Sequence, residues 1–198
     1  MDRERGIIIN MNLRDEILEG TLHIFNQKGL KFTMDDIASS LKISKKTIYT
    51  VFNDKEELFL AMVDFLFDSI KESKREVMEN KEWNTMEKVR RILGVLPEGY
   101  KDVDFRKLYQ LKEKYPNIYK QVEFRLETGW EETIVLIEQG IAEGSIRPIK
   151  IPILKTMMES ALEQFFQRDV LVQNDISYKE ALDEVVNILM DGIIVHGK

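Results

Sequence analysis

The sequence predicts an all-α protein of about nine helices, with a helix-turn-helix head followed by a helical body. Three observations predict this class. Apolar residues recur at spacings of three and four along most of the 198 residues, which is the period of a helix. Ser, Thr, Asn or Asp precedes many of these runs and an acidic residue follows three positions later, the pattern of an N-terminal cap. No useful stretch alternates apolar and polar residues as a half-buried strand does.

The first predicted helix begins after Asn12, which can cap it with Asp15 in the third position, and ends near Gly29. Its apolar stripe consists of Ile17, Leu18, Thr21, Leu22, Ile24 and Phe25. We expect this helix to brace the helix-turn-helix that follows. Arg3 and Arg5 precede this helix and could form a basic arm that reaches into a DNA minor groove. The simpler interpretation is that they belong to a frayed, solvated terminus.

The helix-turn-helix is predicted between Thr33 and Leu58. Thr33 caps the first of its helices, with Asp36 in the third position, and Ser44 caps the second, which we expect to run from Lys45 to Phe52. The period of 3.6 residues places the buried face of that second helix on Ile48, Val51 and Phe52.

The opposite face of this second helix carries the candidate site. Lys46 and Thr50 lie at its centre, and Lys45, Thr47 and Tyr49 flank them. A merely solvated face explains the lysines, whereas the tyrosine and the hydroxyl groups favour a surface for phosphates and base edges. Nearby, Lys55 in the first turn of the next helix would direct a cation toward a phosphate.

Six further helices are predicted after the second helix of the helix-turn-helix. They cover residues 54–79, 84–96, 104–111, 116–143, 152–166 and 177–193. The first of them is roughly 35 Å long at 1.5 Å per residue, enough to connect the head to the body. Pro116 suits the first turn of its helix, and Gly144 ends that helix. The last two helices are apolar over a wider arc than one contact face requires.

Composition narrows the class of protein. Apolar residues make up 43% and charged residues 32%, as in a soluble globular protein. Without cysteine the chain has no disulfide framework and no thiolate chemistry, which favours a reducing cytoplasm. No run of about 18 apolar residues exists, so we expect neither a membrane span nor a signal peptide.

Charge is distributed unevenly. The chain has a net charge of −6, yet residues 28–55 carry +3 and the remainder carries −9. This asymmetry is typical of a small cationic head on an acidic body that repels nucleic acid elsewhere.

No catalytic constellation is visible, so we do not expect an enzyme or a cofactor. The chain lacks a Gly-x-Ser-x-Gly elbow and a phosphate-binding glycine loop. His23 and His196, the only histidines, lie too far apart in the sequence to suggest a metal site.

The amino-terminal quarter of the chain resembles the tetracycline-repressor (TetR) family of bacterial transcriptional regulators. The residues that carry the resemblance are Ile17, Phe25, Gly29, Thr33, Ile37, Ala38, Ser44, Thr47, Tyr49, Phe52, Lys55 and Leu58. Two features depart from the family pattern. Lys42 and Lys46 stand where the family often has glycine, and the link from Gly29 to Ile37 is about one residue short.

The resemblance implies a DNA-binding domain over residues 1–56 and an effector-binding and dimerisation domain over residues 57–198. It implies a homodimer that pairs its last two helices as a four-helix bundle and binds a palindromic double-stranded DNA operator. The implied DNA-contacting residues are Thr33, Ser44, Lys45, Lys46, Thr47, Tyr49, Thr50 and Lys55. Among them, Thr33, Tyr49 and Lys55 would hold phosphates, and Lys45, Lys46, Thr47 and Thr50 would lie nearest the base edges.

A small, largely apolar effector would occupy the inward faces of the middle helices. The candidate lining residues are Leu93, Leu96, Phe105, Tyr109, Phe124, Trp130, Ile134, Met157, Met158, Phe165 and Phe166. Plain core packing is the alternative for each of them, although their aromatic and methionine content suits an adaptable cavity. The expected function is that of a ligand-responsive repressor. The alternative is a helical interaction protein whose helix-turn-helix does not bind DNA.

Overall fold

The computed structural model describes residues 12–97 and 105–195, and this part of the chain is all-α, which confirms the predicted fold class. Twelve α segments are present there, and nine of them are five residues or longer. The other three, α6 (Arg106–Tyr109), α7 (Leu111–Lys114) and α11 (Val170–Gln173), are single turns. No strand forms in the described ranges, where one isolated bridge pairs Ile146 with Ile194.

The chain divides into two compact units, Met1–Phe65 and Leu66–Lys198. Helix α4 (Lys55–Glu79) contributes residues to both. The division therefore falls further along α4 than the boundary after residue 56 that the sequence predicts. Each unit has its own apolar core.

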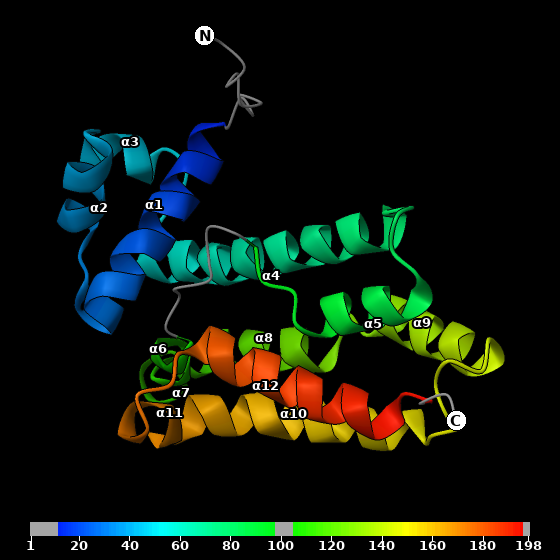
Figure 1. Cartoon of the computed structure of the whole chain (residues 1–198). Coiled ribbons are helices and arrows are strands. Elements are labelled where there is room, and N and C mark those ends of the chain that lie inside the picture. Colours follow the sequence, from blue (N-terminus) through cyan, green and yellow to red (C-terminus); the bar gives the residue numbers. More distant parts are fainter. Residues whose placement is uncertain (1–11, 98–104, 196–198) are drawn as a thin grey trace, which may run out of the picture. The chain divides into compact units, whose positions relative to one another are not determined.

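The first unit contains α1 (Leu13–Lys28), a 3₁₀ turn over Gly29–Lys31, α2 (Met34–Leu41), α3 (Lys45–Tyr49) and the start of α4, labelled in Figure 1. Asn12 caps α1 by accepting from the backbone N–H of Asp15 at 3.0 Å, as predicted. The whole predicted apolar stripe of α1 is buried. The rings of Phe25, Phe32 and Phe59 meet at the centre of this unit, where Phe25 and Phe59 pack edge to face with centroids 5.6 Å apart.

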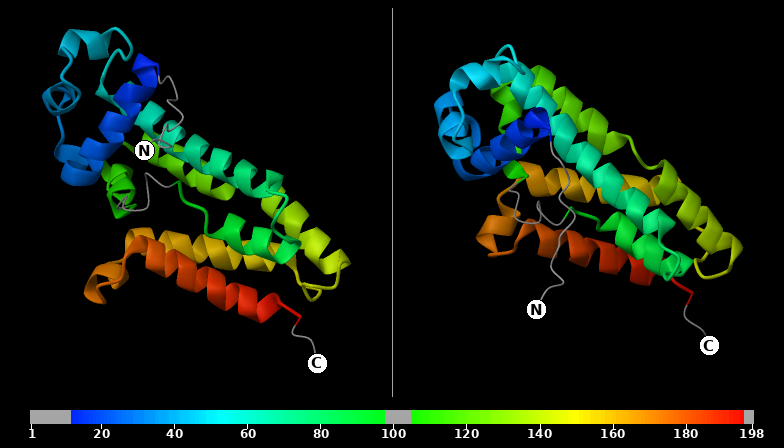
Figure 2. Two further views of the ribbon diagram at one scale, coloured as in Figure 1. Left: turned by 45° about the horizontal axis from the view of Figure 1, so that its top comes forward. Right: turned by 90° about the horizontal axis from the view of Figure 1, so that it is seen from above.

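The second unit contains the rest of α4 and the helices that follow it. Its longer helices are α5 (Thr85–Leu93), α8 (Pro116–Glu127), α9 (Glu131–Ala142), α10 (Ile151–Gln167) and α12 (Tyr178–Ile193). Helices α10 and α12 lie side by side and run in opposite directions, and α5 packs on α9 (Figures 1 and 2). The capping boxes predicted at Asn84 and Ser177 are both formed. Side chains from α5, α9, α10 and α12 form the core, with Ile92, Ile137 and Met190 almost completely buried.

Two helices end earlier than predicted. Helix α3 stops at Tyr49 instead of Phe52, because its last turn tightens: the N–H of Thr50 donates to both Lys46 and Thr47 carbonyls. The backbone N–H of Phe52 still donates to the Ile48 carbonyl group. The side chains of Ile48 and Phe52 are buried as expected, whereas that of Val51 is half-buried. Helix α5 stops at Leu93, where Gly94 leaves the helical conformation, rather than at Leu96.

The single helix predicted over residues 116–143 is wrong. The chain breaks between α8 and α9, where Thr128 is extended and Gly129 has a φ of 76°, a left-handed conformation that favours glycine. The apolar spacing continues across this break, so periodicity did not reveal it. The ammonium of Lys74 holds the break by donating to the Gly129 carbonyl at 2.9 Å.

Some predicted features lie outside the described residues. Arg3 and Arg5 of the basic tail, Asp104 at the start of its predicted helix, and His196 belong to this group.

Candidate functional site

The turn between α2 and α3 is built by local hydrogen bonds. Thr33 and Asp36 form a reciprocal capping box at the start of α2, and Ser44 accepts from the backbone N–H of Thr47 at the start of α3. Between the two helices Lys42 adopts a left-handed conformation with φ 56° and ψ 36°. This conformation explains why glycine would suit the position, because a side chain there is strained.

The outward face of α3 carries the predicted reading residues together. Lys45, Lys46, Tyr49 and Thr50 are exposed, and Tyr49 keeps 49% of its surface accessible. The ammonium of Lys45 pairs with Asp35 at 3.1 Å, a surface ion pair worth about 0–1 kcal/mol. Across residues 12–97 and 105–195, Lys46 and the Tyr49 hydroxyl group have no polar partner. Lys46 and Tyr49 therefore present donors that the described residues do not use, whereas the Thr50 hydroxyl group donates to the Thr47 carbonyl at 2.6 Å and the Thr47 hydroxyl group is hydrogen-bonded to Ser44 at 2.9 Å.

Thr33 and Lys55 have partners within their own unit. The Thr33 hydroxyl group accepts from the Asp36 N–H at 3.2 Å and donates to the Asp36 carboxylate at 2.9 Å. Lys55 donates to the carbonyl groups of Leu30, at 3.3 Å, and of Phe32. Both side chains consequently hold the link between α1 and α2, a role that the sequence did not suggest for Lys55.

Asp36 is the most strongly perturbed acid of this unit. Hydrogen bonds from Lys28 and from Thr33 lower the pKa of its carboxyl group to about 2. The Lys28 ammonium lies 2.6 Å from the carboxylate, so Asp36 also ties the end of α1 to the start of α2.

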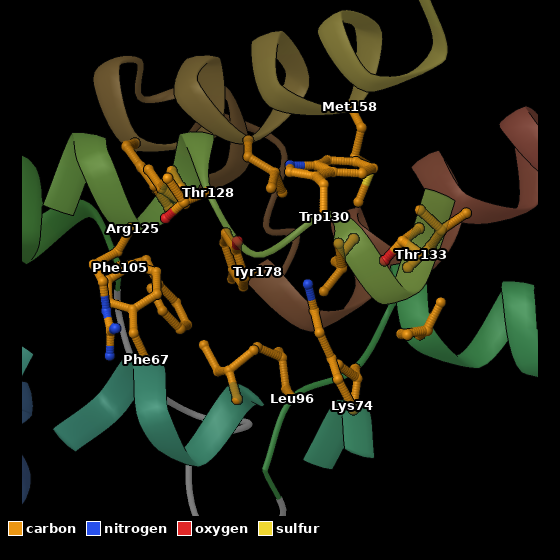
Figure 3. Close-up of a pocket in the computed structure, with 18 residues that line it drawn as sticks. Phe67, Lys74, Leu96, Phe105, Arg125, Thr128, Trp130, Thr133, Met158 and Tyr178 are labelled. Carbon is orange, nitrogen blue, oxygen red and sulfur yellow. The ribbon is translucent and has the colours of Figure 1, made fainter. Parts of the chain in front are cut away.

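A cavity of about 110 Å³ lies within the second unit (Figure 3). Residues from α4, α5, α8, α9, α10 and α12 line it, together with the segment after α5 and the linker between α8 and α9. Most of its surface is apolar, with the polar groups of Lys74, Arg125, Thr133 and Tyr178 among the lining side chains. This combination of an apolar wall and a few polar groups is typical of a small-molecule site.

The structure brings six of the eleven predicted ligand-binding residues to this cavity and leaves the other five elsewhere. The six are Leu93, Leu96, Phe105, Trp130, Met158 and Phe166. Phe124 and Met157 are exposed, Tyr109 packs edge to face on Tyr119, Ile134 packs against the core, and Phe165 packs on the Tyr178 ring.

Sequence reasoning missed the contribution of α4 to the cavity. Phe67, Ile70 and Lys74 all line it, and their spacing of three and four residues places them on one face of the helix. A lysine that continues an apolar stripe was the available signal. Tyr178 was missed because it directly follows the cap of α12 and was read as part of a helix start.

Burial perturbs two polar groups of the cavity. It lowers the pKa of Lys74, an effect that Glu132 and Glu131 partly offset. Burial raises the pKa of the Tyr178 hydroxyl group, which therefore stays protonated as a hydrogen-bond donor. Arg125 forms an ion pair with Asp68 beside the cavity.

Within residues 12–97 and 105–195, no group of three or more His, Asp and Glu side chains is placed to hold a metal ion. None of the helices in the same ranges is both long and apolar enough to cross a membrane.

Over the described residues the fold is all-α, and its amino-terminal unit is a capped helix-turn-helix that exposes Lys46 and Tyr49 without polar partners. These features define a DNA-binding transcriptional regulator. The comparisons with known proteins support this class. The model of the family described as "Bacterial regulatory proteins, tetR family" matches residues 17–62. The chain is 33% identical over 142 residues to the HTH-type transcriptional regulator YhgD of Bacillus subtilis (strain 168), covering 67% of this chain and 71% of that protein. The chain belongs to the TetR family of bacterial regulatory proteins.

Two further relatives extend the similarity over most of the chain. The HTH-type transcriptional regulator YvaF of Bacillus subtilis (strain 168) is 27% identical over 177 residues, which cover 89% of this chain and 93% of that protein. The crystal structure of a TetR transcription regulator from Haloarcula marismortui ATCC 43049 superposes with a TM-score of 0.70 at 17% identity, covering 92% of this chain and 98% of that one. At that identity the likeness shows the shared fold. The two curated relatives are transcriptional regulators and not enzymes.

Proposed function

We propose that the protein is a ligand-responsive transcriptional repressor. In this proposal it binds a palindromic operator as a homodimer, and a small, largely apolar effector releases it. The first unit binds DNA, and the second binds the effector and the partner subunit. Because its target is the bacterial chromosome, the protein would act in the cytoplasm.

The outward face of α3 is the main observation that supports DNA binding. Lys46, exposed with no partner in the described chain, supplies a cation for phosphates or guanine edges, and Thr47 and Thr50 supply hydroxyl groups near the bases. Tyr49 supplies a phenol for a phosphate. Lys45 gives up only a weak surface pair with Asp35 when it turns to DNA. Ser44 positions this face by capping α3.

Thr33 and Lys55 take a positioning role in this proposal. Thr33 caps α2 through Asp36, and Lys55 of α4 holds the carbonyl groups of the segment that joins α1 to α2, so both would set the angle at which α3 is presented. A phosphate contact by either group would compete with partners it already has.

The homodimer is supported by an apolar surface on α10 and α12. Ile153 and Met157 on α10 and Ile188 on α12 are 61%, 53% and 62% exposed, and all three line one groove between the helices. Gly192 on the same face has no atom within 4 Å of an added Cβ, which leaves room for a close helix. Such exposed apolar patches mark protein interfaces. A second copy would cover this one as a four-helix bundle.

The cavity of the second unit supports the effector. A ligand that fits one arrangement of the helices around it would bias the position of α4, since Phe67, Ile70 and Lys74 of that helix line the cavity. Helix α4 continues into the first unit, so its movement would change the separation of two reading helices that must lie roughly 34–36 Å apart on an operator. Coupling between linked sites is typically about 1–3 kcal/mol, which changes operator affinity by roughly 5 to 150-fold.

Selection of genomic DNA fragments by the purified protein tests this function. Recovery of one palindrome, bound by a dimer, is the expected outcome. Sequence-blind binding that disappears as salt rises would instead favour the second candidate, a helical interaction protein whose helix-turn-helix contacts another protein. A specific operator whose affinity ignores every compound that binds the cavity would leave the DNA-binding role intact and remove the effector.

A further inference from the structure

Two cations, Lys74 and Arg125, line a cavity whose surface is otherwise mostly apolar. Figure 3 shows the side chain of Lys74 rising from α4 with its nitrogen toward the region between Trp130 and Tyr178. Its ammonium donates to the Gly129 carbonyl at 2.9 Å, and this is its only hydrogen-bond acceptor in the described chain. An ammonium group has three donors. Two of them are therefore available to a ligand.

A second donor faces the same space. The hydroxyl oxygen of Tyr178 points into the cavity in Figure 3, and it makes no hydrogen bond to any residue described by the structure. The ring packs against Phe105 and Phe166, whose centroids lie 4.4 and 5.8 Å from its own and 5.9 Å from each other. This packing fixes where the hydroxyl group points.

The remaining charges near the cavity do not neutralise Lys74. Asp68, a carboxylate on the same helix, pairs with Arg125 and not with Lys74. Glu131 and Glu132 at the start of α9 act on Lys74 through space, but neither is buried and neither forms a salt bridge with it. Solvent screens such carboxylates strongly. An anion inside the cavity would interact with the ammonium at low dielectric, where the attraction is larger.

We propose that the effector is a small organic monoanion, with an apolar body and one carboxylate that accepts hydrogen bonds from Lys74 and Tyr178. This inference depends on the proposed effector-binding role of the second unit. The body would lie against Trp130, Phe105 and Met158, which are all buried. At about 110 Å³ the cavity is smaller than the cavity of about 150 Å³ that is known to accept benzene, which limits the body to about one aromatic ring.

The hydrogen bond between Lys74 and Gly129 suggests how effector binding would affect α4. Lys74 now ties α4 to the break between α8 and α9 through the Gly129 carbonyl. A carboxylate carries the charge opposite to that of the ammonium, so it would attract Lys74 more strongly than the neutral carbonyl group does and draw it away from Gly129. Binding would therefore loosen the tie between α4 and the α8–α9 linker.

A matched set of ligands tests the inference without DNA. Benzoate, benzyl alcohol and benzylamine share one body and differ in charge, and hexanoate with hexan-1-ol repeats the comparison on an aliphatic body. Binding to the full chain is followed by tryptophan fluorescence in a Trp83→Phe background. The chain has two tryptophans, and only Trp130 lines the cavity, so the signal reports that site.

We expect each acid to bind at least about tenfold more tightly than its alcohol, and the amine to bind most weakly, from the strength of charged hydrogen bonds. Lys74→Met should abolish the preference for acid and leave alcohol binding within about twofold. Tyr178→Phe should reduce it by a few-fold. Lys71→Met, an exposed lysine of the same helix, is the matched control and should change nothing.

Equal binding of acid and alcohol on both bodies, a preference that survives Lys74→Met in a folded variant, or no binding of any of these compounds would overturn the inference. The DNA selection is run on the same protein. A preparation that selects a palindrome but shows no acid preference refutes the monoanion alone, and one with the acid preference but no palindrome refutes the repressor alone.

Discussion

The ammonium of Lys55 lies 4.1 Å from the centroid of the Phe32 ring and donates to the carbonyl group of Phe32, at the centre of the first unit. It also lies 5.4 Å from the Phe59 ring centroid. The cation therefore closes the 3₁₀ turn over the aromatic core. The family resemblance implies a phosphate contact for this lysine, and its contacts within the first unit give it a structural role as well.

Replacing Lys55 by methionine should destabilise the first unit by about 2–4 kcal/mol, because hydrogen bonds to charged groups contribute about 1.5–3 kcal/mol and a cation–π contact about 0.5–1 kcal/mol. Hydrogen-exchange protection of α1 and α2 amides measures the loss. Lys31→Met, exposed in the same turn, should have little effect. If Lys55→Met leaves stability unchanged but lowers the salt dependence of operator binding, the phosphate role is correct.

Replacing Lys46 by alanine should weaken operator binding. If Lys46 contacts a phosphate, the slope of log affinity against log salt should fall in magnitude by about 0.9, because one fewer counterion is displaced. Titrations at several salt concentrations measure both quantities, and Lys120→Ala on α8 is the control. An unchanged affinity and slope would remove Lys46 from the interface.

Two glycine substitutions should change stability in opposite directions. Lys42→Gly should stabilise the first unit by about 0.5–1 kcal/mol, since relief of left-handed strain of about 1–2 kcal/mol exceeds the entropy cost of glycine. Lys46→Gly lies inside α3 and should destabilise by about 0.5–1 kcal/mol. Amide exchange in α2 and α3 measures both. Destabilisation by Lys42→Gly would mean that its side chain contributes more than its backbone costs.

Acid should remove the contribution of Asp36 in a defined pH range. Its pKa is lowered to about 2 in the folded chain, below the ordinary value of 3.8, so folding favours the ionised form. That stabilisation is complete above pH 4 and is lost as the pH falls toward 2. Asp36→Asn should flatten this part of the pH profile of α2 protection. A variant profile parallel to that of the wild type would contradict the assignment, with Asp35→Asn as the neighbouring control.

Charge on the α12 surface should dissociate the proposed dimer. Ile188→Glu places a carboxylate at the centre of the apolar surface, where burial of an unpaired charge is costly. We expect the mass measured by light scattering to fall from dimer to monomer while helicity is unchanged. Val135→Glu alters a similarly exposed residue on α9 and should remain dimeric. A dimeric Ile188→Glu variant would place the interface elsewhere.

The sequence predicted the helix starts well because capping is local. Asn12, Thr33, Ser44, Asn84 and Ser177 all accept from the backbone N–H three residues on, as their spacing indicated. Helix ends were predicted less well. Gly94 and Gly129 end helices through backbone conformation, and apolar spacing continues past both.

The candidate cavity was predicted only in part for a related reason. Periodicity identifies the buried face of a helix but not which buried residues face an empty space. Phe105 and Phe166 line the cavity, whereas Phe165, one residue away, packs outside it. The side chain of Lys74 is held at the cavity by the Gly129 carbonyl group of the α8–α9 linker, which accepts a hydrogen bond from its ammonium.

The sequence by itself determined the class of protein, the capped helices of the head and the side chains on the outward face of α3, because these depend on residues within one or two helical turns of each other. Tertiary structure alone decided that Lys55 closes the core of the head and that Lys74 and Tyr178 point into one cavity. Those contacts join residues far apart in the chain, and their positions depend on how whole helices pack.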